Sequence, residues 1–312
     1  MWKKQRRLIS SVGNVTVDVA AADWFIYSSA RLLDRHRAAV LLHDSPIEPV
    51  LRALAAYRNP DGGYGHALEP DVRGPYSETT STLHALEVLD ELDALGDPLA
   101  DVADWVATVA ESDGGVPFVL PTAAGYPLAA WMVPDGGSHL TFGLAALLGQ
   151  AGARTAWLDA ADEWCWQRLR HVEDLNAYWL KYALDFLDRT ADADRAVRVI
   201  ETLRHLLRPD GSVPVPGGTD DETLSALTLS PSPAARSRAL FTNEQISVCL
   251  DALEAGQQGD GGWTFDWAAW SPAQTDEWRG LVTLKALQTL RTNGRLRLPG
   301  PLSSNTASRK AT

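Results

Sequence analysis

Apolar residues recur along most of the chain at the three-and-four spacing of helices that bury one face. Residues 77–95 show it clearly, with Leu83, Leu86 and Leu89 on one side, and residues 98–110 repeat it after a first-turn proline. The same pattern predicts ten helices in all, over residues 22–41, 46–57, 77–95, 98–110, 139–149, 154–169, 174–189, 192–207, 241–255 and 272–291. Apart from one or two short strands, near residues 15 and 220, we expect no extended structure, so the fold class is all-α.

Asp-Gly pairs separate many of these predicted helices at a nearly constant interval. Those on the period begin at Asp61, Asp113, Asp210 and Asp260, so the intervals are 52, 97 and 50 residues. A fifth pair, at Asp135, lies off the period and is interpreted as an extra turn within a long loop. Halving the middle interval indicates a turn near residue 162 that has drifted or been replaced. A period near fifty is long enough for two helices and a loop, and paired helices form an open solenoid or a closed toroid. With five or six units we expect closure, as an (α/α)5–6 toroid of inner and outer helices.

The length and the net charge limit the domain organisation and the partners that we expect for the protein. The 312 residues are 45% hydrophobic, enough for a substantial core. We expect one toroid domain over residues 21–298, with an N-terminal extension over 1–20 and a flexible tail over 299–312. The net charge of −12 disfavours nucleic acid or an anionic membrane surface as the main partner. No stretch approaches the roughly 20 apolar residues that span a bilayer or forms an export signal, so we expect a cytoplasmic protein of unassigned oligomeric state.

The cysteines and histidines do not form a metal motif. Cys165 and Cys249 lie in apolar helical contexts, where cysteine usually acts as a small buried hydrophobe. Neither has a partner at the spacing of a common zinc motif, and the seven histidines are scattered. We therefore predict no metal site and no cofactor.

Two stretches resemble a known repeat. "GQQGDGGW" (256–263) followed by "EWRGLVTLKAL" (277–287), and "NPDGGYG" followed by "SETTSTLHAL", resemble the QW-type repeats of the terpene cyclase and protein prenyltransferase α/α-toroid superfamily, which includes squalene–hopene cyclases. The resemblance spans roughly residues 46–291 and implies the toroid scaffold. The family's D-x-D-D, D-D-x-x-D and D-x-C elements are absent, so it does not carry the activity across. The nearest acidic string contains Thr219 and Glu222, which we interpret as the capping box of a helix.

The segment "HALEPDVRG" carries the candidate chemistry. If it is extended, Glu69, Asp71 and Arg73 point to one side, and loops that lead into inner helices would rim the central cavity of a toroid. Asp71 would then be the general acid or base, Glu69 the second carboxylate and Arg73 the group that tunes charge or holds an anion. His66 could orient a carboxylate. The alternative interpretation is a salt-bridged surface loop.

Aromatic residues complete the candidate pocket. Twelve tryptophans against six phenylalanines is a lopsided ratio. The predicted substrate-binding aromatics are Tyr64 after the first turn, Trp263, Trp267 and Trp270 in a loop, and Tyr178, Trp179 and Tyr182 on a helix beside Asp185. Such a lining suits a flat or greasy ligand and can stabilise a carbocation, although aromatic residues of a packed core or of a sugar-stacking surface would produce the same pattern.

Three functions therefore remain open. The first is an enzyme that uses carboxylate acid–base chemistry on an isoprenoid or other hydrophobic small molecule. The second is a glycan hydrolase or lyase on an (α/α) toroid, which would also use a carboxylate pair. The third is a non-catalytic toroid that binds a lipid or a protein.

Overall fold

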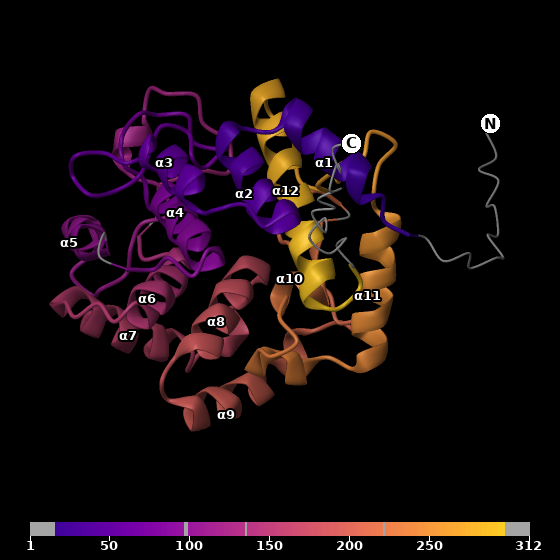
Figure 1. Ribbon diagram of the computed structural model, residues 1–312. Coiled ribbons are helices and arrows are strands. Elements are labelled where there is room, and N and C mark those ends of the chain that lie inside the picture. Colours follow the sequence, from indigo (N-terminus) through magenta and orange to yellow (C-terminus); the bar gives the residue numbers. More distant parts are fainter. Residues whose placement is uncertain (1–15, 97–98, 135, 221, 297–312) are drawn as a thin grey trace, which may run out of the picture.

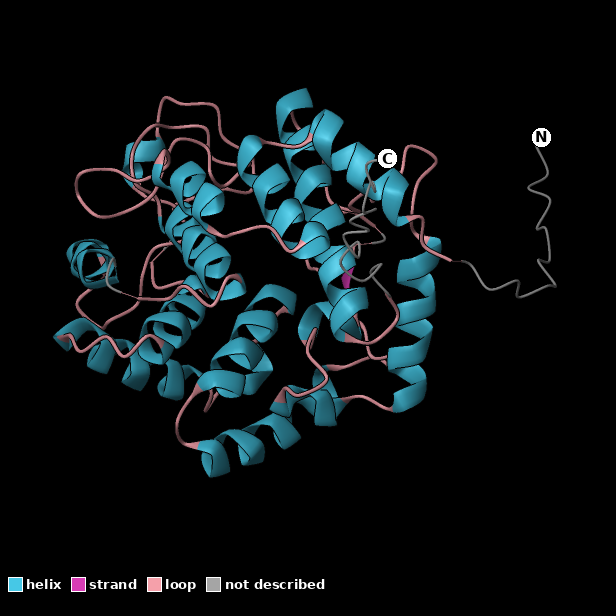
Figure 2. Ribbon diagram, in the orientation of Figure 1, coloured by secondary structure: helices cyan, strands magenta, loops and turns pink. Residues whose placement is uncertain are grey.

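The computed structural model describes residues 16–296, except residues 97–98, 135 and 221. It is mostly helical (Figures 1 and 2), as the apolar spacing predicts. The α-helices of this part of the chain are α1 (Val19–Ser29), α2 (Leu32–His43), α3 (Glu48–Ala55), α4 (Thr79–Glu91), α5 (Leu99–Val109), α6 (Leu140–Gln150), α7 (Ala156–Arg168), α8 (Ala177–Arg189), α9 (Ala193–Leu203), α10 (Ala226–Leu229), α11 (Asn243–Ala255) and α12 (Pro272–Thr292). Short 3-10 turns are η1 (Pro121–Ala123), η2 (Val172–Asp174), η3 (Arg204–Leu206) and η4 (Arg236–Leu240).

Three local expectations differ from the structure. The single helix predicted over 22–41 is two helices, because Ala30 and Arg31 are extended and Arg35 caps the break by donating to the Ala30 carbonyl at 2.8 Å. Helix α10 was not predicted. The capping box at Thr219 and Glu222 begins no helix; the chain continues instead into β2.

The extended structure near residue 220 is a two-residue hairpin. Strands β1 (Val213–Pro214) and β2 (Thr223–Leu224) are antiparallel, with Val213 opposite Leu224. The strand expected near residue 15, the basic start of the chain and the tail over 299–312 lie outside the described residues.

The four Asp-Gly turns share one geometry. In each, the aspartate Oδ1 accepts the backbone N–H two residues on, at 2.9 to 3.1 Å. The first glycine of each turn has a positive φ, which favours glycine: 97° at Gly62, 96° at Gly114, 82° at Gly211 and 93° at Gly261. The sequence repeat is therefore a structural repeat. At the long interval, residues 170–176 with η2 replace the turn, after α7 rather than near residue 162.

Each of three turns packs against the next odd-numbered helix. A Cβ at Gly62 would lie 2.5 Å from the carbonyl oxygen of Asp101 in α5, and one at Gly114 would lie 2.7 Å from the carbonyl carbon of Ala160 in α7. A Cβ at Gly261 would lie 2.2 Å from the carbonyl oxygen of Ala21 in α1. The last turn of the chain thus lies against its first helix.

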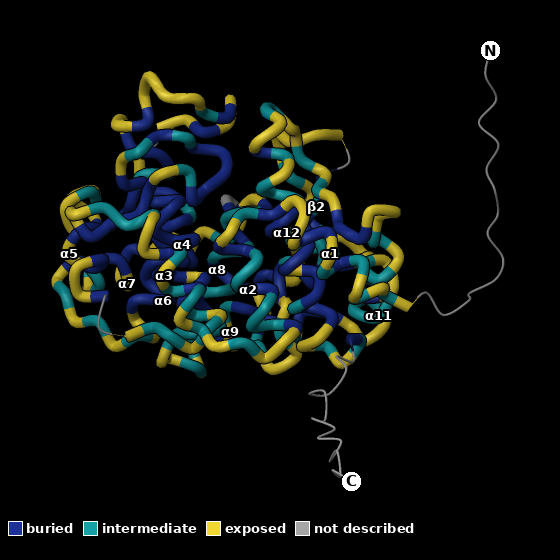
Figure 3. The backbone as a smooth tube through the Cα atoms, turned by 45° about the horizontal axis from the view of Figure 1, so that its top comes forward, coloured by how far each residue is buried: buried dark blue, intermediate teal, exposed yellow. Residues whose placement is uncertain are grey.

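The even-numbered helices pack against one another: α4 on α6, α6 on α8, α8 on α10, and α12 on α2. An ion pair between Arg37 and Glu91 joins α2 to α4. In Figure 1, α5, α7, α9 and α11 lie at the edge of the molecule, and α4, α6, α8 and α12 lie nearer its middle. Figure 3 shows buried backbone through the interior and exposed stretches along the rim.

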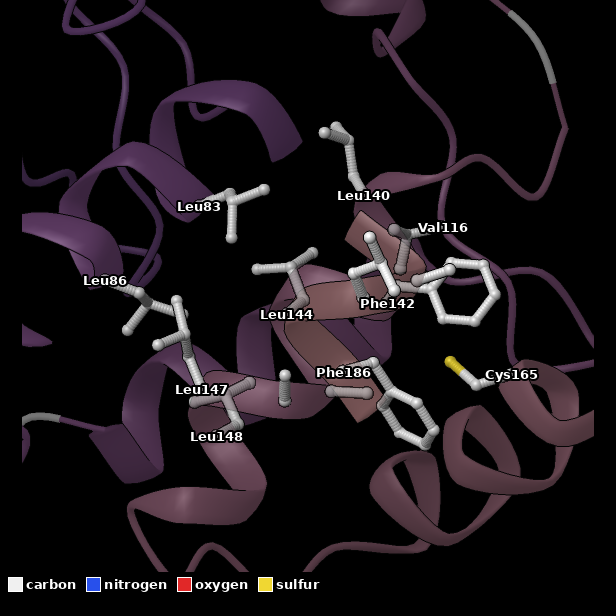
Figure 4. Close-up of a cluster of buried hydrophobic side chains, with 14 of the residues drawn as sticks. Leu83, Leu86, Val116, Leu140, Phe142, Leu144, Leu147, Leu148, Cys165 and Phe186 are labelled. Atoms are coloured by element: carbon white, nitrogen blue, oxygen red, sulfur yellow. The ribbon is translucent and has the colours of Figure 1, made fainter. Parts of the chain in front are cut away.

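Two main clusters of apolar side chains form the core. The larger joins α4, α6 and α8 to their neighbours, and Figure 4 shows part of it, with the rings of Phe142 and Phe186 beside the buried thiol of Cys165. The second places Phe25 and Ile26 of α1 against residues of α12 such as Leu284 and Leu287. Both ends of the described chain therefore share one core. Within the described residues, no helix is both long and apolar enough to cross a membrane.

Candidate functional site

The loop between the first turn and α4 is folded on itself rather than extended. His66 and Ala67 both have positive φ values, 55° and 60°. The Leu68 N–H bonds the Gly65 carbonyl, and the Val72 N–H bonds the Glu69 carbonyl, so the segment forms successive turns. The expected alternation of Glu69, Asp71 and Arg73 on one side of a strand is therefore wrong, because turns rather than a strand set their directions.

Asp71 is the centre of the site and is only 3% exposed. Its Oδ1 accepts the Trp270 indole N–H at 2.9 Å and the Gln274 amide at 3.1 Å, and its Oδ2 accepts the Trp278 indole N–H at 3.2 Å. Burial raises the pKa of Asp71, while these donors, with Trp131 acting in the same direction, favour the charged form and oppose the rise. A carboxylate is thus held by neutral N–H groups from residues about two hundred positions away.

Glu69 has a different environment. Burial and the nearby Asp71 carboxylate raise the pKa of Glu69 to about 8, although Arg31 opposes the rise. Its Oε2 lies 3.6 Å from Nδ1 of His84, and burial and the cations Arg31 and Arg37 hold the pKa of that histidine well below its usual range. At neutral pH the protonated carboxyl of Glu69 therefore faces an uncharged imidazole.

A buried ion network at the start of α2 supports this loop. Asp34 is fully buried and bonds Arg31 Nε at 2.7 Å and Arg37 Nη1 at 3.0 Å. Arg31 Nη1 also donates to the Leu68 carbonyl at 2.8 Å, which ties α2 to the residue before Glu69. None of these residues stands out in the sequence, because arginines and aspartates at helix spacing are usually solvent-exposed.

Arg73 forms an ion pair with Glu277 at the first turns of α12. Its charge is therefore already neutralised by a carboxylate, and this geometry leaves little for the predicted role of holding an anionic group. Together, Asp71 and Arg73 fix the loop to α12.

The loop aromatics divide into two sets. Trp267 lies edge-on to Trp278 at 5.0 Å between ring centroids and stacks on Phe265 at 4.6 Å, so Trp267 and Trp270 belong to the Asp71 site. Trp263 is buried, and its indole donates to the Leu253 carbonyl at 2.7 Å, so it packs the scaffold.

Tyr64 and His66 lie away from the carboxylates. Tyr64 is buried in the core cluster, and its backbone N–H donates to Thr82 Oγ1 at 3.1 Å. His66 is exposed, and its Nε2 lies 2.9 Å from Asn59 Oδ1. The expectation that His66 orients a carboxylate is wrong, because the left-handed backbone at this position directs its ring to the turn.

The aromatics of α8 surround His139 instead of Asp71. The ring centroids of Tyr178, Trp179 and Tyr182 lie 6.2, 5.9 and 5.3 Å from that of His139. Burial lowers the pKa of His139 to about 3, so its ring is an uncharged member of the aromatic group. Asp185, the last predicted residue, pairs with Arg189 at 2.9 Å.

One water-accessible stripe runs along the inner face of α12. Trp278 and Val282 are half-buried and Lys285 is exposed, whereas the residues on either side of Lys285, Leu284 and Ala286, are buried. On α4, Glu87 is likewise exposed between buried neighbours. On α8, half-buried Lys181, Tyr182 and Asp185 form a third such stripe.

Charges on these stripes act on one another. The pKa of Lys285 is lowered to about 8, first by Lys181 and then by burial, while Glu87 and Asp185 oppose the change. The pKa of Tyr182 is raised well above its usual range by burial, with Glu87 and Glu69 adding to the rise. Polar groups of α4, α8 and α12 therefore influence one another's protonation, and Glu69 acts on Tyr182 in the same way.

Two hollows on the surface lie elsewhere. One, of about 500 Å³, is lined by residues of α2 and α3, including Leu32, His36 and Tyr57. The other, of about 450 Å³, lies at the last Asp-Gly turn around Asp260 and Arg279. Among the residues that the structure places, no three histidine, cysteine, aspartate or glutamate side chains gather as a metal site.

The comparisons with known proteins inform the fold and not the chemistry. No family profile matches the chain, and no curated protein matches it. A solved structure described as the crystal structure of a protein from Actinoplanes is similar, with a TM-score of 0.56 and 17% sequence identity, over 88% of this chain and 98% of that one. At that identity the likeness shows a shared fold alone.

Proposed function

We propose that the protein is an acid–base enzyme in which Glu69 gives a proton to the substrate while Asp71 remains ionised. The observation that supports this proposal is that two carboxyl groups, two residues apart in the sequence, have different surroundings. Burial raises the pKa of both groups, that of Glu69 to about 8, but at Asp71 indole and amide N–H groups favour the charged form and oppose the rise. Carboxyl pairs whose environments separate their protonation states are typical of acid–base sites.

The scaffold that we propose for this site is a closed toroid of six helix pairs. In support, the even-numbered helices pack in series, α4 on α6, α6 on α8, α8 on α10 and α12 on α2, and three of the turns pack against the next odd-numbered helix. The turn at Gly261 reaches α1, which would complete the circle.

The acidity of Glu69 distinguishes between substrate classes. A general acid works best when its pKa lies near the working pH, and a group with a pKa of about 8 matches an oxygen leaving group. It is a poor match for protonating an alkene, whose conjugate acid is far stronger. The charged stripes near Glu69 also suit a polar ligand. We therefore place a glycoside first, stacked on the indoles. Glu69 would protonate the bridging oxygen as its bond to the sugar carbon breaks, Asp71 would stabilise the positive charge on that carbon, and water would add to it and release a proton.

One observation favours a second candidate, an isoprenoid or similar hydrophobic substrate. The indole N–H groups of Trp270, Trp278 and Trp131 converge on one carboxylate, and Trp131 is 39% exposed. Their ring faces could stabilise a carbocation.

The proposal is tested with four proteins: wild type, Glu69→Gln, Asp71→Asn and Glu78→Gln. The turnover of each is measured on a panel of aryl glycosides and on a panel of isoprenoids. Glu78 is a matched control, because it is also buried with a raised pKa, of about 7, but its carboxylate bonds the Leu120 N–H and Thr122. We expect Glu69→Gln to lose about 10²- to 10⁴-fold in kcat on one panel and Glu78→Gln to retain activity. Equal activity of wild type and Glu69→Gln would refute the assignment. Ligand binding without turnover in all four proteins would indicate a non-catalytic toroid.

A further inference from the structure

The hollow between α2 and α3 contains no residue of the Asp71 site. The two helices pack against each other (Figure 1), and residues of both, with Tyr57 just beyond α3, line the hollow. Its volume of about 500 Å³ lies within the range of small-molecule binding sites. The chemistry of its lining therefore indicates which kind of molecule fits.

One face of α3 forms an apolar floor of small side chains. Pro49, Ala53 and Ala56 lie at positions i, i+4 and i+7 of the helix, so they share a face, and all three line the hollow. A different face of the helix carries Val50 and Leu54, which are buried in the larger core cluster. Because an alanine side chain ends at Cβ, the floor is low and the space beside it stays open.

Leucines at the start of α2 form the facing wall. Leu32 and Leu33 both line the hollow, and Leu32 is 62% exposed. Apolar surface in contact with water is unfavourable, and a ligand with an apolar body would remove part of this surface from water. The floor and the wall therefore suit an alkyl or aryl group.

The polar side chains that line the hollow can all donate hydrogen bonds. They are the guanidinium of Arg52, the imidazole of His36 and the hydroxyl of Tyr57. Burial raises the pKa of Tyr57, so its hydroxyl keeps its proton. No aspartate or glutamate is among the described residues that line the hollow, although the chain has 40 acidic and 28 basic residues. This set of donors suits a ligand with a negatively charged acceptor group.

Arg52 is free to bind such a group. The neighbouring arginines each bond an acceptor of the protein itself: Arg31, Arg35, Arg37 and Arg58. Within the described residues, the side chains of Arg52 and His36 have no ion pair and no hydrogen bond. The hollow thus offers one permanent positive charge that no protein group neutralises.

We infer that the hollow between α2 and α3 binds a small apolar carboxylate, a molecule with an alkyl or aryl body and one carboxylate group. The body lies on the alanines of α3 and against Leu32. The carboxylate accepts from Arg52, because the planar guanidinium matches the two oxygens of a carboxylate. One permanent cation also matches a single negative charge better than the two charges of a phosphate monoester. The inference does not depend on the acid–base activity proposed for Glu69.

The probe for this site is octanoate. Its two counterparts are 1-octanol, which lacks the charge, and acetate, which lacks the apolar body. Isothermal titration calorimetry with wild type compares the three. We expect a Kd for octanoate below about 1 mM, and binding of 1-octanol and of acetate that is weaker by at least about tenfold, because each lacks one of the two groups that the hollow recognises.

Four variants show where octanoate binds. Ala56→Trp fills the hollow, whereas Ala55→Trp adds the same side chain at an exposed neighbouring position that does not line it. Arg52→Gln removes the charge at the hollow, whereas Arg198→Gln removes a charge from an exposed position of α9. We expect Ala56→Trp to lose octanoate binding. Arg52→Gln should bind octanoate at least about tenfold more weakly and 1-octanol as wild type does. Both control variants should match wild type.

Three results would overturn the inference. They are equal octanoate affinities of Ala56→Trp and Ala55→Trp, equal affinities of wild type for octanoate and 1-octanol, and a Kd for octanoate above about 10 mM. Thermal melting shows whether each variant is folded, and the comparison of octanoate with 1-octanol in wild type decides the charge requirement without any variant. Because binding is measured and not turnover, the outcome is independent of whether the protein is an enzyme.

Discussion

At the scale of single residues, the chemistry depends on what surrounds two similar side chains. Glu69 and Asp71 both lie in one loop, but Asp71 receives neutral N–H donors from the end of the chain and Glu69 receives a carboxylate neighbour and a histidine. The sequence singles out both residues because acidic side chains cluster after a turn. It does not show which is the acid, since Trp278 and Gln274 are distant in sequence and unremarkable there.

The raised pKa of Glu69 predicts a pH-dependent stability. Its folded-state pKa of about 8 exceeds the ordinary value of 4.5, so between these values the folded protein holds a proton that the unfolded chain releases. The free energy of unfolding should therefore fall as pH rises from about 4.5 to 8, by at most about 1.4 kcal/mol for each unit of pKa difference. Urea unfolding of wild type and Glu69→Gln across this range measures it. The variant should show the flatter curve, and parallel curves would contradict the prediction.

At the scale of elements, one hydrogen bond links the turns to the helices that follow them. The N–H groups of Tyr64, Val116 and Trp263 each come directly after an Asp-Gly-Gly turn. They donate to the side-chain oxygens of Thr82, Thr141 and Thr283, at 2.9 to 3.1 Å. A buried threonine of the following helix therefore completes each of these three junctions, near the start of α4 and of α6 and in the middle of α12.

Substituting Thr82 by valine removes the acceptor and leaves a buried N–H without a partner. We expect Thr82→Val to reduce the free energy of unfolding by about 1 to 3 kcal/mol. Thr80 is the matched control, because it lies on the same helix and its buried hydroxyl has no hydrogen-bond partner within the described residues. Thr80→Val should be neutral or stabilising. Denaturant midpoints compare the two variants, and equal losses would rule out the hydrogen bond as the cause.

The sequence predicts elements of this kind well where their signals are local. The Asp-Gly pairs predict the four turns because the glycine in each allows the positive φ that the turn needs. The spacing of apolar residues predicts most of the helices. The sequence does not mark the break at Ala30, because no glycine or proline lies there and its cap comes from the Arg35 side chain. Helix α10 was missed because four residues are too few to show a helical period.

At the scale of the whole molecule, contacts between the two ends of the chain hold the site together. Asp71 bonds α12 and the loop before it, Gln257 bonds both backbone polar groups of Asp18, and α1 shares a core with α12. The repeat interval led us to expect five or six units and closure, but no local signal could predict which side chains join the ends.

Removing the Asp71 carboxylate should loosen this junction. Asp71→Ala leaves the N–H groups of Trp270, Gln274 and Trp278 without their acceptor, so we expect a loss of several kcal/mol of stability, at about 1 to 3 kcal/mol per unsatisfied group. Hydrogen exchange should quicken in residues 263–278 and 66–73 and change little in α6 and α8. Glu69→Gln, which keeps the Asp71 contacts, should leave exchange in 263–278 unchanged. Uniform quickening across the chain would contradict a local junction.

The packing of the last turn and α12 on α1 also constrains synthesis on the ribosome. Phe25 and Ile26 are among the first described residues to emerge, but their partners in α12, Leu284 and Leu287, follow about 260 residues later. At translation rates of about 5 to 20 residues per second, that delay is on the order of 10 to 50 s. During this time the apolar face of α1 has no native partner from the C-terminal end of the chain. The first helix of the described residues thus gains α2 as a partner early and α12 only at the end.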